Sequence, residues 1–129
     1  MANIVPYSFP VQLLSGAHQF QTAGNNFYLA LYTANPYTTA STVYSSTTEV
    51  SSAGGSQYTA GGNLLTGQAV SNVNNVATVD FADSVWGTPT AATFTAAFGA
   101  IYNSTSSNKL VVVLDFSGNK TCTNGTFTV

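Results

Sequence analysis

Hydrophobic residues recur mostly at every second position along this chain, which is the pattern of β-strands. One early segment differs, because four apolar residues follow one another at close to helical spacing: Phe9, Leu13, Ala17 and Phe20. Pro10 stands where the first turn of such a helix accepts proline. We therefore expect a short N-terminal helix over residues 10–20, with Ser15 and Gly16 as its weakest point.

The remaining alternating segments are short and are separated by turn signals. Residues 27–32 predict a strand with both faces covered, which Asn35 and Pro36 end. The segments NLLTGQAVSNV and ATVDF flank Asn74 and Asn75, so we expect a β-hairpin there. The nearly continuous apolar run KLVVVLDF predicts a central strand, SGNKTCTNG a turn region, and GTFTV a short last strand.

The segment TFTAAFGAIY, which follows the single tryptophan Trp86, predicts a strand with two different faces. We expect the face with the larger apolar side chains to lie in the core: Phe94, Ala96, Phe98, Ala100 and Tyr102. The other face is small and uncharged, and would meet either a second sheet or a neighbouring subunit: Thr93, Thr95, Ala97, Gly99 and Ile101. Trp86 would anchor the edge of the sheet.

About seven or eight short strands, with turn signals every ~8–12 residues, indicate an all-β fold. We expect a single-domain β-sandwich or jelly-roll-like architecture over residues 1–129, because no repeat or linker divides the chain. Residues 36–62 are the longest irregular stretch and hold only a weak strand near VYSSTTEV. Because long loops are often functional, residues 36–62 and residues 1–9 are candidate contact arms. A plain surface loop is the alternative for residues 36–62.

The chain carries very little charge. Only 5% of its residues are charged, against about 25% in a typical soluble domain. Its two cations, Lys109 and Lys120, cannot neutralise the phosphates of a nucleic acid. No apolar run approaches the ~20 residues that cross a bilayer, and the first residues lack the features of a secretory signal. We expect neither nucleic acid nor membrane as a partner, and the net charge of −2 favours association with other proteins.

The residues that most often carry chemistry are few and scattered. Asp80 and Asp83 lie three positions apart on a strand pattern, so they point to opposite faces and suit turns better than acid–base pairing or Ca²⁺ binding. His18 is the only histidine, and we expect it to pack or to form hydrogen bonds. Cys122 has no second cysteine beside it and is expected to be a small, half-buried side chain. The sequence therefore predicts no catalytic site, no metal and no cofactor.

Seven tyrosines and eight phenylalanines are the more suggestive signal. Four tyrosines lie in or beside the loop-rich region, where we expect that a core cannot hold them all: Tyr32, Tyr37, Tyr44 and Tyr58. Tyrosine is enriched at protein interfaces, and exposed aromatic residues together with Asn also suit a sugar-binding surface. A third interpretation, in which these tyrosines cover the domain's own core, stays open.

Five blocks in a specific order span nearly the whole chain: SFPVQLLSGAHQF (8–20), NNFYLALYT (25–33), TTEVSSAGGSQYTAGGNLLTG (47–67), ATVDFADSVW (77–86) and TAAFGAIYNSTSSNKLVVVLDFSGNKTCTNGTFTV (95–129). Together they resemble a family of small, low-charge, all-β virion structural proteins of tailed, often marine, bacteriophages. Relatives often carry a basic residue where Pro10 stands and an arginine where Ala97 stands, so any family contact that uses these charges is lost here.

The resemblance implies a structural role in the virion and supplies no catalytic residue. We expect a capsid decoration (cement) protein that binds the phage major capsid protein outside the shell, bridges neighbouring subunits and forms a homo-oligomer, with a trimer favoured. A tail, baseplate or head-fibre component is one alternative, and a host-glycan-binding module is another. The candidate protein-contact residues are Tyr32, Tyr37, Tyr44, Tyr58 and Ala97.

Overall fold

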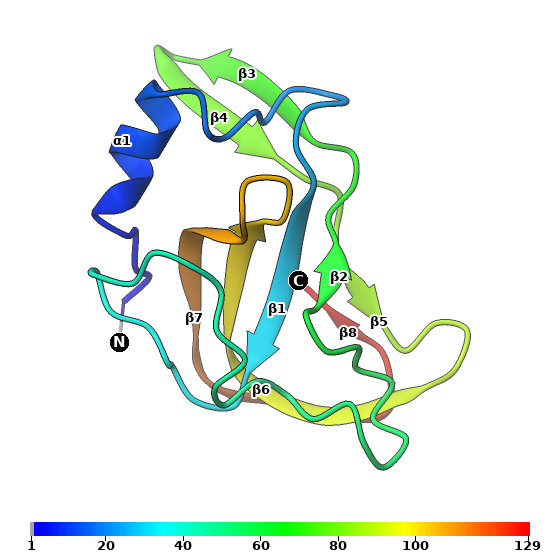
Figure 1. The fold of residues 1–129 in the computed structure, drawn as a ribbon. Helices are drawn as coiled ribbons and strands as arrows, with labels where there is room; N and C mark the ends of the chain where they lie inside the picture. The colour runs from blue at the N-terminus through cyan, green and yellow to red at the C-terminus, as the bar shows by residue number, and fades with distance from the viewer. Residues whose placement is uncertain (1) are drawn as a thin grey trace.

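A computed structural model describes residues 2–129 and shows a mostly β chain with one short helix (Figure 1). The elements in chain order are α1 (Ser8–Leu14), β1 (Phe27–Tyr32), β2 (Asn63–Leu64), β3 (Ala69–Val73), β4 (Val76–Asp80), β5 (Val85–Trp86), β6 (Ala92–Asn103), β7 (Lys109–Gly125) and β8 (Phe127–Thr128). They form a four-stranded sheet in the order β2-β1-β6-β7 and two ribbons, β3-β4 and β5-β8. All pairings are antiparallel.

The N-terminal helix is shorter than the expected residues 10–20, because it ends after Leu14. Gly16 adopts a left-handed φ of 77°. The N–H of Gly16 binds the carbonyl of Leu13, and the N–H of Ala17 binds the carbonyl of Gln12. This pair of hydrogen bonds is the Schellman closure that glycine permits at a helix C-terminus.

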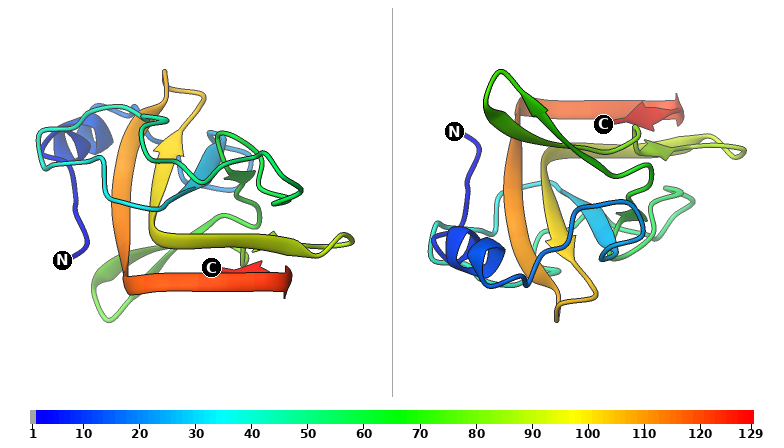
Figure 2. Two further views of the ribbon diagram at one scale, coloured as in Figure 1. Left: turned by 90° about the horizontal axis from the view of Figure 1, so that it is seen from below. Right: turned by 90° about the horizontal axis from the view of Figure 1, so that it is seen from above.

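The strand at residues 27–32 and the last strand are confirmed, but β7 differs from its prediction in two ways. SGNKTCTNG is wrong as a turn region, since β7 continues through it to Gly125. Ser117 and Gly118 adopt positive φ values of 58° and 110° within that run. There the register with β6 jumps, so that two positions along β6 correspond to five along β7. Both strands bend at this bulge, and their two halves run in different directions (Figure 2).

The bulge also divides the face of β6 that was expected to be continuous. Phe94 and Ala96 pack in one hydrophobic cluster with β1 residues, whereas Phe98, Ala100 and Tyr102 pack in the second cluster. Ile101, assigned from the sequence to the opposite face, packs against the first cluster instead. The prediction of one core face from residue 94 to residue 102 is therefore wrong, since a bulge reverses the alternation of side chains beyond it.

The prediction that KLVVVLDF is a central strand is also wrong, because β7 lies at the edge of the four-stranded sheet. Two irregular segments cover that edge. Ile4 exchanges backbone hydrogen bonds of 2.9 and 2.8 Å with Val113, and the carbonyl of Thr42 accepts a hydrogen bond from the N–H of Leu110. The run is apolar on both faces because Leu110 and Val113 enter one cluster and Val111 enters the other.

The hairpin predicted at Asn74 and Asn75 is confirmed, and both residues adopt the positive φ of a tight turn, 51° and 63°. Trp86 is buried and packs against Phe127 across the β5-β8 ribbon. Among residues 2–129, no helix is long and apolar enough to span a membrane.

Candidate functional site

Residues 36–62 contain no strand, yet a network of hydroxyl groups around one carboxylate orders them. Glu49 accepts hydrogen bonds of 2.6 Å from the hydroxyls of Tyr44 and Tyr58, and one of 2.7 Å from the N–H of Gly61. The Tyr58 hydroxyl in turn accepts a hydrogen bond from the N–H of Leu31 on β1. The weak strand expected near VYSSTTEV is reduced to single bridges, Tyr32 with Glu49 and Val43 with Lys109.

A second group of hydroxyls continues the network at the start of the same segment. The hydroxyls of Tyr32 and Tyr37 lie 2.7 Å apart, and that of Tyr32 donates to the carbonyl of Ser45 at 2.8 Å. The N–H of Ser45 donates to the Tyr37 hydroxyl. The buried hydroxyls of Tyr32, Tyr37 and Tyr58 thus each have a partner, which is the condition under which a buried polar network stabilises a fold.

These positions overturn the expectation that a core cannot hold the tyrosines. Tyr32, Tyr37 and Tyr58 expose 0%, 4% and 3% of their surface, and Ala97 exposes 5%. Their aromatic faces are unavailable to a partner protein or to a sugar, so they are not contact residues in this conformation. Tyr44 is half-buried, and its ring packs against that of Tyr102 at a tilt of 30°, with ring centroids 4.6 Å apart. No signal in the alternation of residues 36–62 distinguishes such a network from a loose loop.

Burial of the network raises the pKa of Tyr102 to about 12, with the Glu49 charge as a further cause. Burial likewise raises the pKa values of Tyr32, Tyr37, Tyr44 and Tyr58. Tyrosines of the unfolded chain ionise near pH 10. Their contribution to stability is therefore complete below pH 10 and is lost as the pH rises above it, because unfolding then releases protons.

We expect the urea midpoint of unfolding to be markedly lower at pH 11 than at pH 8. The measurement is urea unfolding followed by circular dichroism, with the absorbance of tyrosinate recorded on the same samples. Most of the tyrosinate signal should appear together with unfolding. Full ionisation of the tyrosines near pH 10 in a still folded chain would contradict the network.

The other singled-out polar residues have structural places. His18 is buried, and its ring nitrogens lie 3.0 Å from Gln12 Oε1 and 3.1 Å from Asn103 Nδ2. Burial, with the Lys109 charge, lowers its pKa. The prediction that His18 forms hydrogen bonds is confirmed, although it follows the helix instead of lying within it. Cys122 is more deeply buried than expected, with 6% of its surface exposed.

Of the two neighbouring aspartates expected at strand ends and turns, Asp80 is confirmed at the end of a strand, whereas Asp83 follows in an irregular segment. Asp80 ends β4, and its Oδ1 accepts the N–H of Phe81 at 3.0 Å. Asp83 is exposed in the irregular segment before β5. Among residues 2–129, no three His, Cys, Asp or Glu side chains gather to hold a metal ion.

Exposed apolar side chains provide the strongest candidate for a site. Tyr7, Val11 and Leu14 follow the helical spacing of i, i+4 and i+7, so they form one stripe along α1, which we call the helix stripe. Their exposed fractions are 74%, 69% and 91%. A surface helix normally turns its apolar stripe toward the core, so this stripe is available to a partner.

An apolar groove is lined by residues of α1, the β3-β4 hairpin and the sheet. Figure 1 shows how these elements are arranged. The groove has a volume of about 610 Å³. Its walls include Phe9 and Leu13 of the helix, Val70 and Val79 of the hairpin, and Ile101 of β6. Of the described residues that line it, none is an Asp, Glu, Lys or Arg. Together, the helix stripe and the groove can bind an apolar surface.

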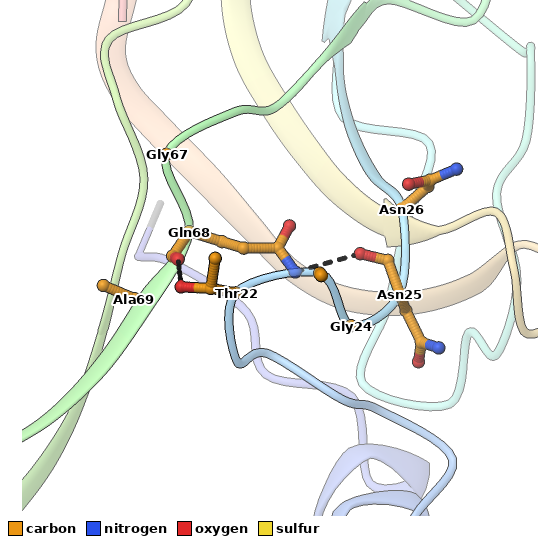
Figure 3. A pocket seen from close by; sticks show the side chains of 8 residues that line it. Thr22, Gly24, Asn25, Asn26, Gly67, Gln68 and Ala69 are labelled. Atoms are coloured by element: carbon orange, nitrogen blue, oxygen red, sulfur yellow. Dashed lines mark hydrogen bonds between the residues drawn. The ribbon is translucent and has the colours of Figure 1, made fainter.

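A small polar hollow of about 340 Å³ lies at the base of the hairpin (Figure 3). Gln68 fills its centre, and its Nε2 donates to the carbonyls of Gln21 and Asn25 at 2.9 and 3.1 Å. Thr22 Oγ1 donates to the carbonyl of Gln68. These bonds tie the hairpin to the segment before β1.

Comparison with family models, with curated proteins and with solved structures finds no match to this chain.

Proposed function

We propose that this chain is a structural protein of a bacteriophage virion, a capsid decoration protein that binds the outside of the capsid and bridges neighbouring capsid subunits. The helix stripe is the observation that carries the proposal. It presents three large apolar side chains on a short helix, one of them 91% exposed. Exposed apolar groups gathered on one face mark binding surfaces for proteins.

The lack of charged side chains in the segment that carries the stripe suits attachment to a large assembly. The first 48 residues contain no Asp, Glu, Lys or Arg. Attachment by this surface would depend on apolar burial, at about 1.5–3 kcal/mol for each fully buried side chain of this kind. One copy would bind weakly once the entropy of association is subtracted, but a homo-oligomer on a repeating shell gains avidity.

The proposal includes the finer features expected from the sequence. The bend of β6 and β7 at the bulge supports a sandwich-like or jelly-roll-like arrangement, because it gives the two halves of these strands different directions. The partner would be the major capsid protein, and the place of the chain would be the assembled virion.

The experiment is co-sedimentation of the purified protein with purified capsids that lack it. We expect saturable binding at hundreds of copies per particle, with less than about a two-fold change in affinity between low and near-molar salt, since few ion pairs exist to be screened. Leu14→Asp should weaken binding by about 100-fold, because it places a charge in the apolar contact. Leu14 is 91% exposed, so this variant should fold normally.

Thr90→Asp is the matched control, because Thr90 is exposed in the loop between β5 and β6 and outside both the stripe and the groove. It should bind like the unaltered protein. Equal binding by Leu14→Asp, or release of the folded protein by salt, would exclude the helix stripe as the contact. Six to eighteen copies per virion would instead indicate a tail component.

A further inference from the structure

The β3-β4 hairpin is held firmly at its base but is left uncovered along its length. Within residues 2–129, its two strands pair only with each other. All five residues of β3 are exposed, and only Thr78 of β4 is half-buried. The exposed side chains include four valines: Val70, Val73, Val76 and Val79. An isolated two-stranded hairpin is only marginally stable in water, and an added strand stabilises it.

The position of the hairpin is nevertheless fixed by hydrogen bonds at its base. Gln68 ties the start of β3 to the segment before β1, as Figure 3 shows. The N–H of Ala82, just after β4, donates to the carbonyl of Thr66 at 2.9 Å. The hairpin is thus a preorganised element, and a partner strand would meet it without first having to order it.

The outer edge of β3 lacks the usual protection against strand pairing. Exposed edges are normally blunted by charged side chains, proline or a bulge. β3 reads AVSNV, its pairing with β4 is regular, and no charged residue occurs from Asn63 to Val79. β4 differs, because it carries Asp80 and its residues Ala77, Thr78 and Val79 line the apolar groove.

We propose that β3 pairs with β3 of a second copy of this chain, antiparallel about a two-fold axis at Ser71. The two-residue loop makes Val73 and Val76 a hydrogen-bonded pair. Because hydrogen-bonded and non-hydrogen-bonded pairs alternate along an antiparallel ladder, Ser71 and Thr78 are also a hydrogen-bonded pair. Val70 and Asn72 then direct their backbone N–H and C=O groups away from β4. These groups would form the new ladder, Val70 with Asn72 of the second copy and the reverse.

A second copy suits this edge because β3 is complementary to itself. In the two-fold register, Ser71 faces Ser71 of the second copy and Val73 faces Ala69 of the second copy, so no charges meet and no large side chains collide. The charged residue of the hairpin strands, Asp80, lies on β4 opposite Ala69, one strand removed from the contact. Two hairpins would merge into one four-stranded sheet. The row of side chains that Val70 and Val79 form on one face would then continue onto the hairpin of the second copy.

The contact closes at two copies, since a two-fold interface uses the same surface on both subunits. It therefore gives a dimer in place of the trimer favoured from the sequence. A five-residue edge buries much less than the roughly 800 Å² per partner of a standard interface, so the dimer forms and dissociates with concentration. It does not depend on a capsid and is tested on the isolated protein.

The first test is cross-linking of Ser71→Cys. At a non-hydrogen-bonded antiparallel pair the two Cα atoms lie about 4.5 Å apart, which a disulfide can span. Mild oxidation should give a covalent dimer at least about ten-fold faster than Thr90→Cys, the exposed control, because pairing raises the effective thiol concentration. The native Cys122 is buried and contributes equally to both variants.

The second test uses opposite charges at the same position. Ser71→Lys and Ser71→Glu should each be monomeric at concentrations where the unaltered protein dimerises, because like charges would lie directly opposite each other. An equimolar mixture should restore the dimer as a heterodimer, which unfolding of either variant could not produce. Analytical ultracentrifugation measures all three samples. Cross-linking at the rate of the control, a monomer or trimer of the unaltered protein, or no restoration in the mixture would each overturn the proposal.

Discussion

Replacing Glu49 by alanine is expected to lower the free energy of unfolding by about 3 kcal/mol, roughly 10 °C in melting temperature. The side chain accepts three hydrogen bonds of 2.6–2.7 Å, from Tyr44, Tyr58 and Gly61. Hydrogen bonds to a charged acceptor contribute about 1.5–3 kcal/mol each. Glu49 and Tyr44 are half-buried, so in the variant water can replace some of the hydrogen bonds that Glu49 accepted. The buried Tyr58 hydroxyl would keep only the N–H of Leu31 as its partner.

Asp83→Ala is the matched control, because it removes an exposed carboxylate and should change the free energy of unfolding by less than about 0.5 kcal/mol. Tyr58→Phe removes the hydroxyl that donates to Glu49 but keeps the aromatic ring and the Glu49 charge. It therefore measures the loss of one hydrogen bond of the network without removing the carboxylate. In a double-mutant cycle, Glu49→Ala and Tyr58→Phe should be non-additive by about 1 kcal/mol or more. Additive effects, or a loss as small as that of Asp83→Ala, would show that the carboxylate does not hold residues 36–62 in place.

This network explains why the tyrosines were misjudged from the sequence. Residues 36–62 lack hydrophobic alternation, and a chain without it is normally an exposed loop. Instead, the hydroxyls of five tyrosines form hydrogen bonds inside the fold. Tyr32 pairs with Tyr37, and Tyr102 donates to the carbonyl of Gly61. A tyrosine can be buried when its hydroxyl finds a partner, and those partners lie up to 41 positions away in the chain. Local periodicity carries no information on contacts of that separation.

The correct predictions share a local cause. Asn74 and Asn75 specify their hairpin through their own tolerance of positive φ, and β1 follows from an apolar run ended by proline. The missed continuation of β7 and the divided face of β6 arise at one place, where Ser117 and Gly118 form a bulge within a segment that reads as a turn. A bulge and a turn use the same residues, so only the pairing of strands distinguishes them. The helix stripe was missed because an exposed apolar helix has the same periodicity as a buried one.

Replacing Gly62 by alanine is expected to destabilise the protein by more than about 4 kcal/mol, enough to lower the melting temperature by roughly 15 °C or to prevent folding. Gly62 is buried at a φ of 83°, which disfavours any residue with a Cβ atom. The added Cβ would also overlap the carbonyl group of Leu29 and the Cα of Ala30, which belong to the backbone of β1 and cannot rotate away. Thermal unfolding followed by circular dichroism gives the measurement.

Gly54→Ala isolates the backbone part of this effect. Gly54 has a comparable φ of 67°, but apart from its two chain neighbours no described residue lies within 4 Å of the position that its Cβ would take. It should cost about 1 kcal/mol, the penalty of the left-handed conformation alone. The difference between the two variants then measures how closely residues 59–62 lie against β1, next to the Gly61 that binds Glu49. Equal losses would mean that this segment can move away from β1, and the Glu49 network would then lack the rigid support that its effect on stability requires.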